Sequence, residues 1–223
     1  MAILEVRGVR FSHGRGKKKK EVLCGASASF EEGRVYALLG KSGAGKSTFL
    51  SLLSALLLPD EGEVLFDGKK TSELNALAYR RNDVAMIYQD FALFPLLNVT
   101  ENIVYPMSLQ KKKPAEQRQR AKELAGEVGL APELMPRYPA AISGGEQQRV
   151  AIARALAAGA RVILADEPTG NLDSANSEQI VELLKKSAHE EGRCVIIVTH
   201  DPEVAKNADA VLRLEDGTIR EVG

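Results

Sequence analysis

A nine-residue segment, Gly40 to Thr48, has the composition of a loop that binds phosphate. Its sequence GKSGAGKST fits the pattern G-x-x-x-x-G-K-[ST]. In such a loop the backbone amides surround the phosphates, the lysine (Lys46) reaches the terminal ones, and the hydroxyl of Ser47 binds Mg²⁺. Apolar runs at residues 35–39 and 49–58 flank it. This order of strand, loop and helix predicts a nucleoside triphosphate site; the alternative is a Gly-rich turn joining a buried strand to a buried helix.

A second segment, residues 143–149, predicts a capped helix with an anion site at its start. Ser143 and Glu146 form an S-x-x-E capping box, and apolar residues recur after them at helical spacing. Gly144 and Gly145 each cost a helix about 1 kcal/mol relative to alanine, which a simple cap would not favour. Their amides lie at the positive end of the helix dipole, where a phosphate binds. Alone, the segment fits a cap or an anion site equally; the upstream loop favours the second.

Two adjacent acids follow an apolar run that predicts a strand buried on both faces. Residues 162–165 form this run, and Asp166 and Glu167 come directly after it. Open α/β sheets bind ligands at the carboxyl ends of their strands, where buried acids are costly unless they meet a metal or take part in chemistry. Asp166 therefore suits the outer shell of Mg²⁺, and Glu167 suits orienting or deprotonating an attacking water. The alternative is a strand that ends in a solvated acidic turn.

Two further apolar runs end in polar residues. Residues 84–88 precede Gln89, and residues 194–198 precede Thr199 and His200. Taken singly, Gln89 and His200 are compatible with ordinary strand ends. If the strands are parallel, however, their ends converge, and both side chains then face the γ-phosphate.

The elements around these segments predict how they are positioned. Apolar strands alternate with amphipathic helices, one of them at residues 180–188, and this alternation predicts a parallel, right-handed α/β core. Residues 3–11 and 22–30 predict two antiparallel strands ahead of that core. Helical patterns at residues 100–109 and 114–128 predict a separate helical part.

Together these motifs resemble the nucleotide-binding subunit of ABC transporters over essentially the whole chain, in the family's order. The resemblance implies an α/β fold: a P-loop NTPase (RecA-like) parallel-sheet core, an N-terminal antiparallel β subdomain and an inserted helical subdomain. It implies one ABC ATPase domain at 1–223. Residues 1–89 and 149–223 would form the nucleotide-binding core with the β subdomain, and residues 90–148 the helical subdomain that carries the signature motif.

The resemblance also implies a role for each matching residue, with ATP and Mg²⁺ as the cofactors. Asp173 would communicate across a dimer. Phe11 lies where the family has an aromatic ring that stacks on adenine, although a core strand residue is its alternative. The implied catalytic residues are Glu167, His200, Gln89 and Lys46, and the implied Mg²⁺ ligands are Ser47, Gln89 and Asp166. The implied ATP contacts are Phe11, Gly40, Lys41, Ser42, Gly43, Ala44, Gly45, Lys46, Ser47, Thr48, Ser143, Gly144, Gly145, Glu146 and Asp173.

Two residues of the signature depart from the family's pattern. Ile142 replaces leucine, and Glu146 stands where glutamine is commonest, so a negative charge lies near bound phosphate and would weaken closure slightly. The combination SGGEQQR with DEPTGNLD is similar to one subgroup, which includes the lipoprotein-releasing, macrolide-export, antimicrobial-peptide-resistance and cell-division ATPases.

The function implied is ATP hydrolysis by a nucleotide-sandwich homodimer that powers a separate integral membrane permease, in export or in lipid, peptide or lipoprotein handling. One alternative is a soluble ABC-type ATPase in nucleic-acid or ribosome-related work, although the long coiled-coil insertion or second cassette usual there is absent from this sequence. Another is cell-division signalling without transport. An apolar stretch after Gln89, residues 91–97, is either core of the helical subdomain or an exposed groove for a short permease helix.

Composition limits the partners. The 30 basic residues balance 30 acidic ones, so no nucleic acid is expected as a partner. The longest apolar run is shorter than the roughly 20 residues that span a bilayer, so no direct membrane insertion is expected. Cys24 and Cys194 predict reduced core thiols. We therefore expect a cytoplasmic protein, peripheral on the inner face of the cell membrane through its permease. The charge run from Lys17 to Lys20 predicts either a solvated hairpin tip or a contact with anionic lipid or a partner.

Overall fold

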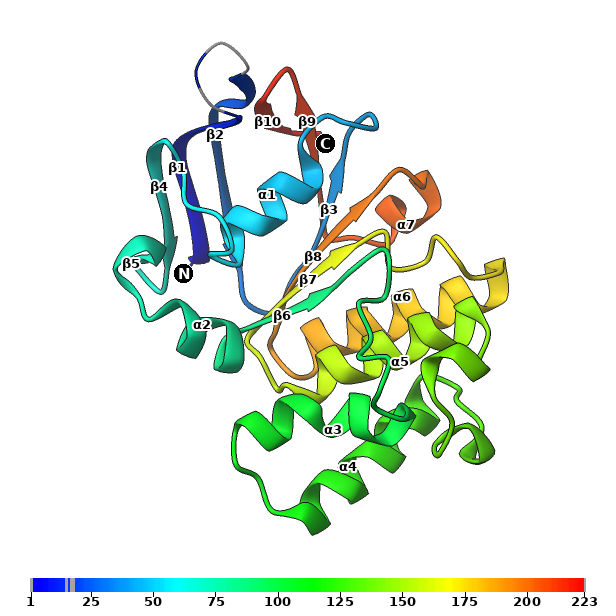
Figure 1. Cartoon of the computed structure of the whole chain (residues 1–223). Coiled ribbons are helices and arrows are strands. Elements are labelled where there is room, and N and C mark those ends of the chain that lie inside the picture. Colours follow the sequence, from blue (N-terminus) through cyan, green and yellow to red (C-terminus); the bar gives the residue numbers. More distant parts are fainter. Residues whose placement is uncertain (1, 15, 17–18, 223) are drawn as a thin grey trace.

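The larger of two β-sheets forms the centre of the molecule. The computed structural model describes residues 2–14, 16 and 19–222, and Figure 1 shows the arrangement of its elements. This sheet has the order β10-β9-β3-β8-β7-β6, and all neighbours pair in parallel except β10 with β9. Its strands are β3 (Val35–Leu39), β6 (Val84–Ile87), β7 (Val162–Asp166), β8 (Cys194–Thr199), β9 (Ala210–Glu215) and β10 (Thr218–Glu221). The predicted parallel core is confirmed.

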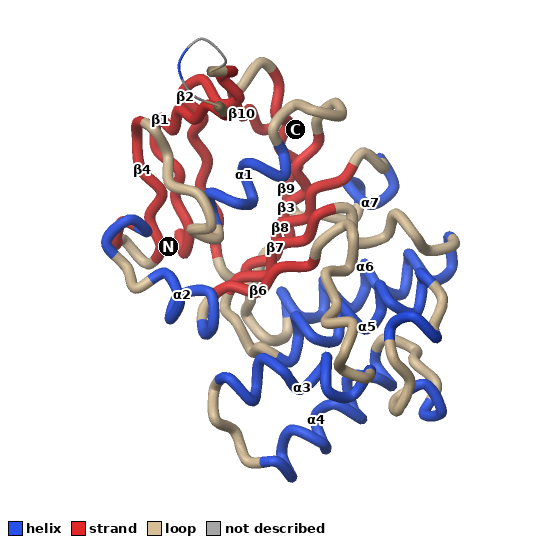
Figure 2. Tube along the Cα trace, viewed as in Figure 1, coloured by secondary structure: helices blue, strands red, loops and turns tan. Residues whose placement is uncertain are grey.

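A smaller antiparallel sheet stands beside it, with the order β2-β1-β4-β5. Its strands are β1 (Ala2–His13), β2 (Lys20–Glu31), β4 (Glu61–Phe66) and β5 (Lys69–Lys70). The predicted antiparallel pairing of the first two strands is confirmed. Figures 1 and 2 show α1 (Lys46–Leu53) between the two sheets. Its buried residues Phe49 and Leu50 belong to one hydrophobic cluster with residues of both sheets.

The central strands are buried on both faces, and alternate residues feed two cores. Along β8, Val195 and Ile197 pack in the core that contains the helices after β6, whereas Cys194, Ile196 and Val198 pack in the core around α1. This period of two is the geometry of a strand between two layers. Cys194 is buried as predicted, and Cys24 is half-buried.

Most of the remaining helices cover the other face of the central sheet, whereas α2 packs on the side of α1 through Tyr79. Two begin with complete capping boxes, Asn98 with Glu101 and Ser143 with Glu146. The helices are α2 (Ala76–Asn82), α3 (Val99–Leu109), α4 (Pro114–Glu127), α5 (Gly144–Ala157), α6 (Ser174–His189) and α7 (Pro202–Lys206), with 3₁₀ turns at Thr71–Glu73, Pro132–Leu134 and Pro139–Ala141. The expected subdomain boundary between residues 148 and 149 falls inside α5, so this helix runs from the helical part into the core.

The first helix is shorter than its apolar run predicts. It ends at Leu53, and Ala55 has a left-handed φ of 52°. Side chains of α2 hold this end: the Tyr79 hydroxyl donates to the Leu53 carbonyl at 2.8 Å, and Arg80 donates to the Ala55 carbonyl at 2.7 Å. Because long-range partners satisfy the last carbonyls, the chain turns away while the run is still apolar. Leu56 is consequently exposed.

Within the described ranges no helix is long and apolar enough to cross a membrane. The lysine run lies partly outside the described residues, since these exclude Lys17 and Lys18. Lys19 forms an ion pair with Asp60 at 3.2 Å, and Lys20 is exposed.

Candidate active site

The predicted strand ends meet at one cavity of about 720 Å³. It lies over the start of α1, at the carboxyl ends of the central strands, as expected for a parallel sheet. The residues that line it are His13, Lys20, Val22, Ser42, Gly43, Gly45, Lys46, Ser47, Thr48, Gln89, Asp166, Glu167 and His200. The structure therefore brings together the phosphate loop and the polar ends of β6, β7 and β8.

The phosphate loop depends on glycines at two kinds of position. Gly43 and Gly45 have φ of 76° and 102°, which favour glycine. A Cβ on Gly40 would lie 2.8 Å from the Leu214 carbonyl, so only glycine fits there without a shift. Lys46 begins α1 and folds over the loop, where its ammonium donates to the carbonyls of Gly40 at 2.7 Å and Lys41 at 3.2 Å. The loop thus has the tight backbone that phosphate-binding amides require.

Asp166 and Ser47 form the part of the cavity that fits Mg²⁺. Asp166 is the last residue of β7 and is 8% exposed. Burial raises the pKa of Asp166 above its ordinary value, and a hydrogen bond from Ser47 opposes the rise. In the described part of the chain no group of three or more His, Cys, Asp or Glu could hold a metal. One carboxylate with one hydroxyl nevertheless suits Mg²⁺, which takes its remaining ligands from water and substrate phosphates.

Glu167 occupies a strained position beside His200. Its φ is 49°, an uncommon conformation for a residue with a side chain, and its amide donates to the Val198 carbonyl at 2.9 Å. Its Oε1 lies 2.8 Å from Nδ1 of His200, and Oε2 accepts a 3.5 Å hydrogen bond from Thr199. The Glu167 side chain is 12% exposed and that of His200 is 78% exposed. Strain of this kind costs roughly 1–3 kcal/mol and is concentrated at functional sites.

The signature residues lie outside this cavity. Ser143 and Gly144 are exposed at the start of α5. The Glu146 carboxylate accepts hydrogen bonds from the Ser143 amide at 2.7 Å and the Ser143 hydroxyl at 2.8 Å, which lower the pKa of Glu146. Asp173 is nearby: it caps α6 through the Asn176 amide at 2.9 Å, and Asn176 accepts from Arg149 of α5. Neither Asp173 nor the signature lines the cavity around Lys46 in the described chain.

Comparison with known proteins identifies the family. A family model described as ABC transporter matches residues 23–170. The chain belongs to the ABC transporter family. It is 40% identical over 223 residues to an uncharacterised ABC transporter ATP-binding protein, MJ1508, of Methanocaldococcus jannaschii, with 99% of each chain covered. It is also 39% identical to the macrolide export ATP-binding/permease protein MacB 2 of Aeromonas hydrophila subsp. hydrophila, covering 98% of this chain and 34% of that protein.

Solved structures agree with this assignment. The dimeric, post-hydrolysis structure of the ATP-binding cassette MJ0796 bound to ADP and Pi has a TM-score of 0.94 and 37% identity, covering 98% of this chain and 97% of that chain. The predicted fold is confirmed, and so is the enzyme class: this cassette is an ATPase that uses ATP and Mg²⁺. It spans the full length of the archaeal relative and about a third of the MacB relatives.

The aromatic residue expected at the adenine lies beneath the surface of this cassette. Phe11 is 8% exposed, belongs to the core around α1 and does not line the cavity. His13 does line it, with Nε2 3.0 Å from the Thr48 hydroxyl. The two rings meet edge to face with centroids 5.0 Å apart. Sequence reasoning did not select His13, although the period of two along a strand places it on the same face as Phe11.

Proposed function

We propose that two copies of this cassette enclose ATP between them and use its hydrolysis to drive a separate membrane permease. The carrying observation is that one chain holds both phosphate-binding segments but keeps them apart: the loop at Lys46 lines the cavity, and the exposed signature does not. A second copy supplies the missing wall if its Ser143 faces that cavity. The dimeric state of the relative MJ0796 supports this arrangement.

In this proposal the phosphate loop holds the triphosphate. Its amides surround the phosphates, and the ammonium of Lys46 leaves the carbonyls of Gly40 and Lys41 to contact the β- and γ-phosphates. Ser47 and Asp166 would hold Mg²⁺, with Gln89 as a further ligand. The bound metal would supply neutralisation of the charge that develops on the phosphates.

Glu167 is the residue that acts on water. Its carboxylate faces the cavity beside Asp166 and orients or deprotonates the water that attacks the γ-phosphate. His200, 2.8 Å from Oε1, fixes the direction of that carboxylate and contacts the γ-phosphate. The strained backbone at Glu167 fits a side chain held in place for chemistry.

The partner copy completes the site. Gly144 and Gly145 present amides at the start of α5, and Ser143 adds a hydroxyl, so this end of the helix binds the γ-phosphate held by the other copy. Glu146 contacts the same phosphate region through Ser143. Asp173, joined to α5 through Asn176 and Arg149, transmits the state of one site to the other.

Mixed dimers test the two-copy site. Lys46→Ala removes the phosphate lysine and Ser143→Arg blocks the signature, so each homodimer has no intact site, whereas the heterodimer keeps one. We expect purified, doubly tagged heterodimers to recover hydrolysis, with Ser72→Arg, an exposed serine outside the site, as the matched control. Suppose that the tagged heterodimer hydrolyses ATP no faster than either homodimer, although its Ser143→Arg subunit still binds ATP. Then either the two-copy site is wrong or hydrolysis needs both sites of the dimer to be intact.

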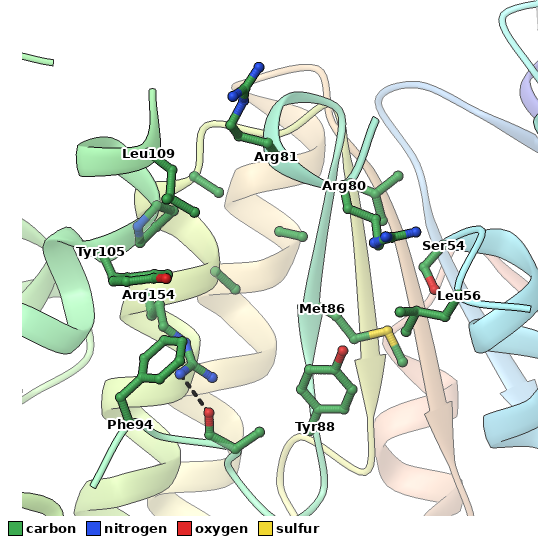
Figure 3. Close-up of a pocket in the computed structure, with 16 residues that line it drawn as sticks. Ser54, Leu56, Arg80, Arg81, Met86, Tyr88, Phe94, Tyr105, Leu109 and Arg154 are labelled. Atoms are coloured by element: carbon green, nitrogen blue, oxygen red, sulfur yellow. Dashed lines mark hydrogen bonds between the residues drawn. The ribbon is translucent and has the colours of Figure 1, made fainter. Parts of the chain in front are cut away.

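The permease would bind a groove between α3, β6 and the loop after Gln89. This groove has a volume of about 260 Å³ and is lined by apolar side chains together with Arg80, Arg81 and Arg154; among the described residues no carboxylate lines it. Figure 3 shows the three arginines around it. Of the apolar stretch after Gln89, Phe94 and Leu96 are exposed, whereas Leu93 packs on the core. An apolar groove with unpaired positive charge fits a short helix that carries an acidic residue.

Introducing a negative charge into the groove tests this proposal. Leu56→Glu and Phe94→Glu are expected to leave folding and basal hydrolysis intact and to abolish copurification with the membrane permease. Leu77→Glu is the matched control, because Leu77 is 75% exposed on α2 and does not line the groove. If binding survives both substitutions, the permease docks elsewhere. In cells, the same variants should no longer localise to the inner face of the membrane, because the permease holds the cassette there.

A further inference from the structure

Arg154, near the end of the signature helix α5, reaches into the loop that follows Gln89. Its Nη1 donates to the Ala92 carbonyl at 2.7 Å and its Nη2 donates to the Phe91 carbonyl at 2.8 Å. Figure 3 shows Arg154 beside the ring of Phe94, with a hydrogen bond to a carbonyl of this loop. Its guanidinium also lies 5.7 Å from the centre of the Phe94 ring. One side chain of α5 thus binds two consecutive carbonyls of a segment that begins at Gln89.

The two carbonyls belong to residues with unusual backbone conformations. Phe91 and Ala92 have φ of 64° and 46°, although neither is glycine. Such conformations persist only where the surroundings hold them. Within the loop the Phe91 amide donates to the Tyr88 carbonyl at 3.1 Å, and the Ala92 amide donates to the Asp90 carbonyl at 2.7 Å. Arg154 ties this strained turn to α5, while Asn102 of α3 holds the loop further along through two hydrogen bonds with Phe94.

Burying Arg154 has a cost that the pair of hydrogen bonds must offset. Among the described residues no carboxylate forms an ion pair with it, and burial lowers the pKa of Arg154. The planar guanidinium places one donor nitrogen on each of the two adjacent carbonyls, so a single side chain holds both. These two hydrogen bonds hold the guanidinium against the turn.

The same loop also touches the other end of α5. A Cβ added to Gly144 would lie 3.8 Å from Cζ of Phe91, so the Phe91 ring packs against the first glycine of the signature. Phe91 therefore contacts α5 twice, through its ring at the start of the helix and through its carbonyl at Arg154. A shift of the loop moves both contacts together.

We propose that Arg154 is a positioning residue that joins Gln89 to the signature helix. When Gln89 contacts the γ-phosphate of its own site, the turn at Phe91 and Ala92 transfers that state through Arg154 to α5. The signature of the same copy is then held in the orientation that closes on the ATP of the partner. This inference rests on the proposed contact of Gln89 with the γ-phosphate.

The test measures dimer formation by the isolated cassette, so it needs no permease. In the Glu167→Gln background, where ATP is not consumed, light scattering gives the ATP concentration at half-maximal dimerisation. Arg154→Met is expected to raise it by roughly tenfold to a hundredfold, the range for loss of charge-assisted hydrogen bonds. ATP binding to the monomer should be unchanged, because Arg154 does not line the nucleotide cavity. Arg118→Met is the matched control, since Arg118 is exposed on α4.

The decisive comparison combines substitutions. If Arg154 acts through Gln89, Gln89→Ala with Arg154→Met dimerises no worse than Gln89→Ala alone. Additive losses overturn the inference, because they show a structural role independent of Gln89. Arg154→Gln provides the second arm if the methionine variant unfolds: wild-type dimerisation by the glutamine variant also overturns it. If Gln89→Ala alone has no effect, the proposed role of Gln89 is the part that fails.

Discussion

The two phosphate-binding segments of this cassette both begin a helix, but they begin it differently. At the start of α1, Gly45 has a left-handed conformation and no side-chain cap, so the helix amides are unshielded. At the start of α5, Ser143 and Glu146 cap the helix with their own side chains. An uncapped start is satisfied by a ligand, whereas a capped start is stable without one. The first segment therefore suits nucleotide binding by a single copy, and the second suits a contact between copies that forms and breaks.

Removing the carboxylate of Glu167 separates hydrolysis from both kinds of binding and has the largest expected effect. Glu167→Gln should lower turnover by roughly 10²–10⁴-fold, the usual contribution of a general base. Because neither helix start is altered, ATP should still bind and the uncleaved nucleotide should hold the dimer together. Phosphate release and light scattering in ATP check this, with the exposed Glu116→Gln as control. Near wild-type turnover would remove Glu167 from the mechanism.

The uncapped start of α1 should lose affinity for ATP when Lys46 is removed. Lys46→Ala deletes the cation facing the phosphates, and we expect ATP affinity to fall by roughly tenfold to a hundredfold. The control is Lys122→Ala, an exposed lysine on α4. Titration with a fluorescent nucleotide measures the affinity of each. If Lys46→Ala binds ATP as wild type does, the loop does not hold the phosphates in the way proposed.

The capped start of α5 should support tighter dimerisation when the charge of Glu146 is removed. The Glu146 carboxylate accepts the Ser143 hydroxyl at 2.8 Å, so phosphate from the partner copy competes with it. Glu146→Gln keeps a capping side chain but removes the negative charge, and dimerisation in ATP should strengthen severalfold at low salt. The measurement is the ATP concentration at half-maximal dimerisation in the Glu167→Gln background. Unchanged or weaker dimerisation would show that the charge does not oppose closure.

The pH dependence of this cap follows from the same hydrogen bonds. They lower the pKa of Glu146 below its ordinary value, so the ionised carboxylate stabilises the fold at neutral pH. That contribution is present above the unfolded pKa and is lost as the pH falls through the folded pKa, in the acid range. Glu146→Gln should therefore flatten the acid side of the stability curve, measured by thermal unfolding, relative to Glu116→Gln.

The strand ends of the site were predictable because local composition specifies them. Buried parallel strands are continuous apolar runs, so the first polar residue after each run marks the sheet edge, as with Asp166 and Gln89. The end of α1 was not predictable, because Tyr79 and Arg80 of another helix determine it. The contacts of Arg154 were not predictable for the same reason, because its partners lie more than sixty residues earlier in the chain.

The smallest expected effect concerns the side of the cavity where the end of β1 meets the start of α1. His13 lines the cavity and contacts Thr48, while Phe11 supports its ring from the core. We expect His13→Ala to raise the KM for ATP a few-fold, the lower end of the roughly 1–3 kcal/mol of a ring stacked on a base, without altering stability. Phe11→Ala should instead destabilise the fold by about 3–5 kcal/mol, the cost of emptying a core aromatic site. Calorimetry and steady-state kinetics distinguish them, and His13→Phe should restore the KM because it keeps a flat ring. If Phe11→Leu, which preserves the core, raises the KM while His13→Ala does not, Phe11 is the residue that meets adenine.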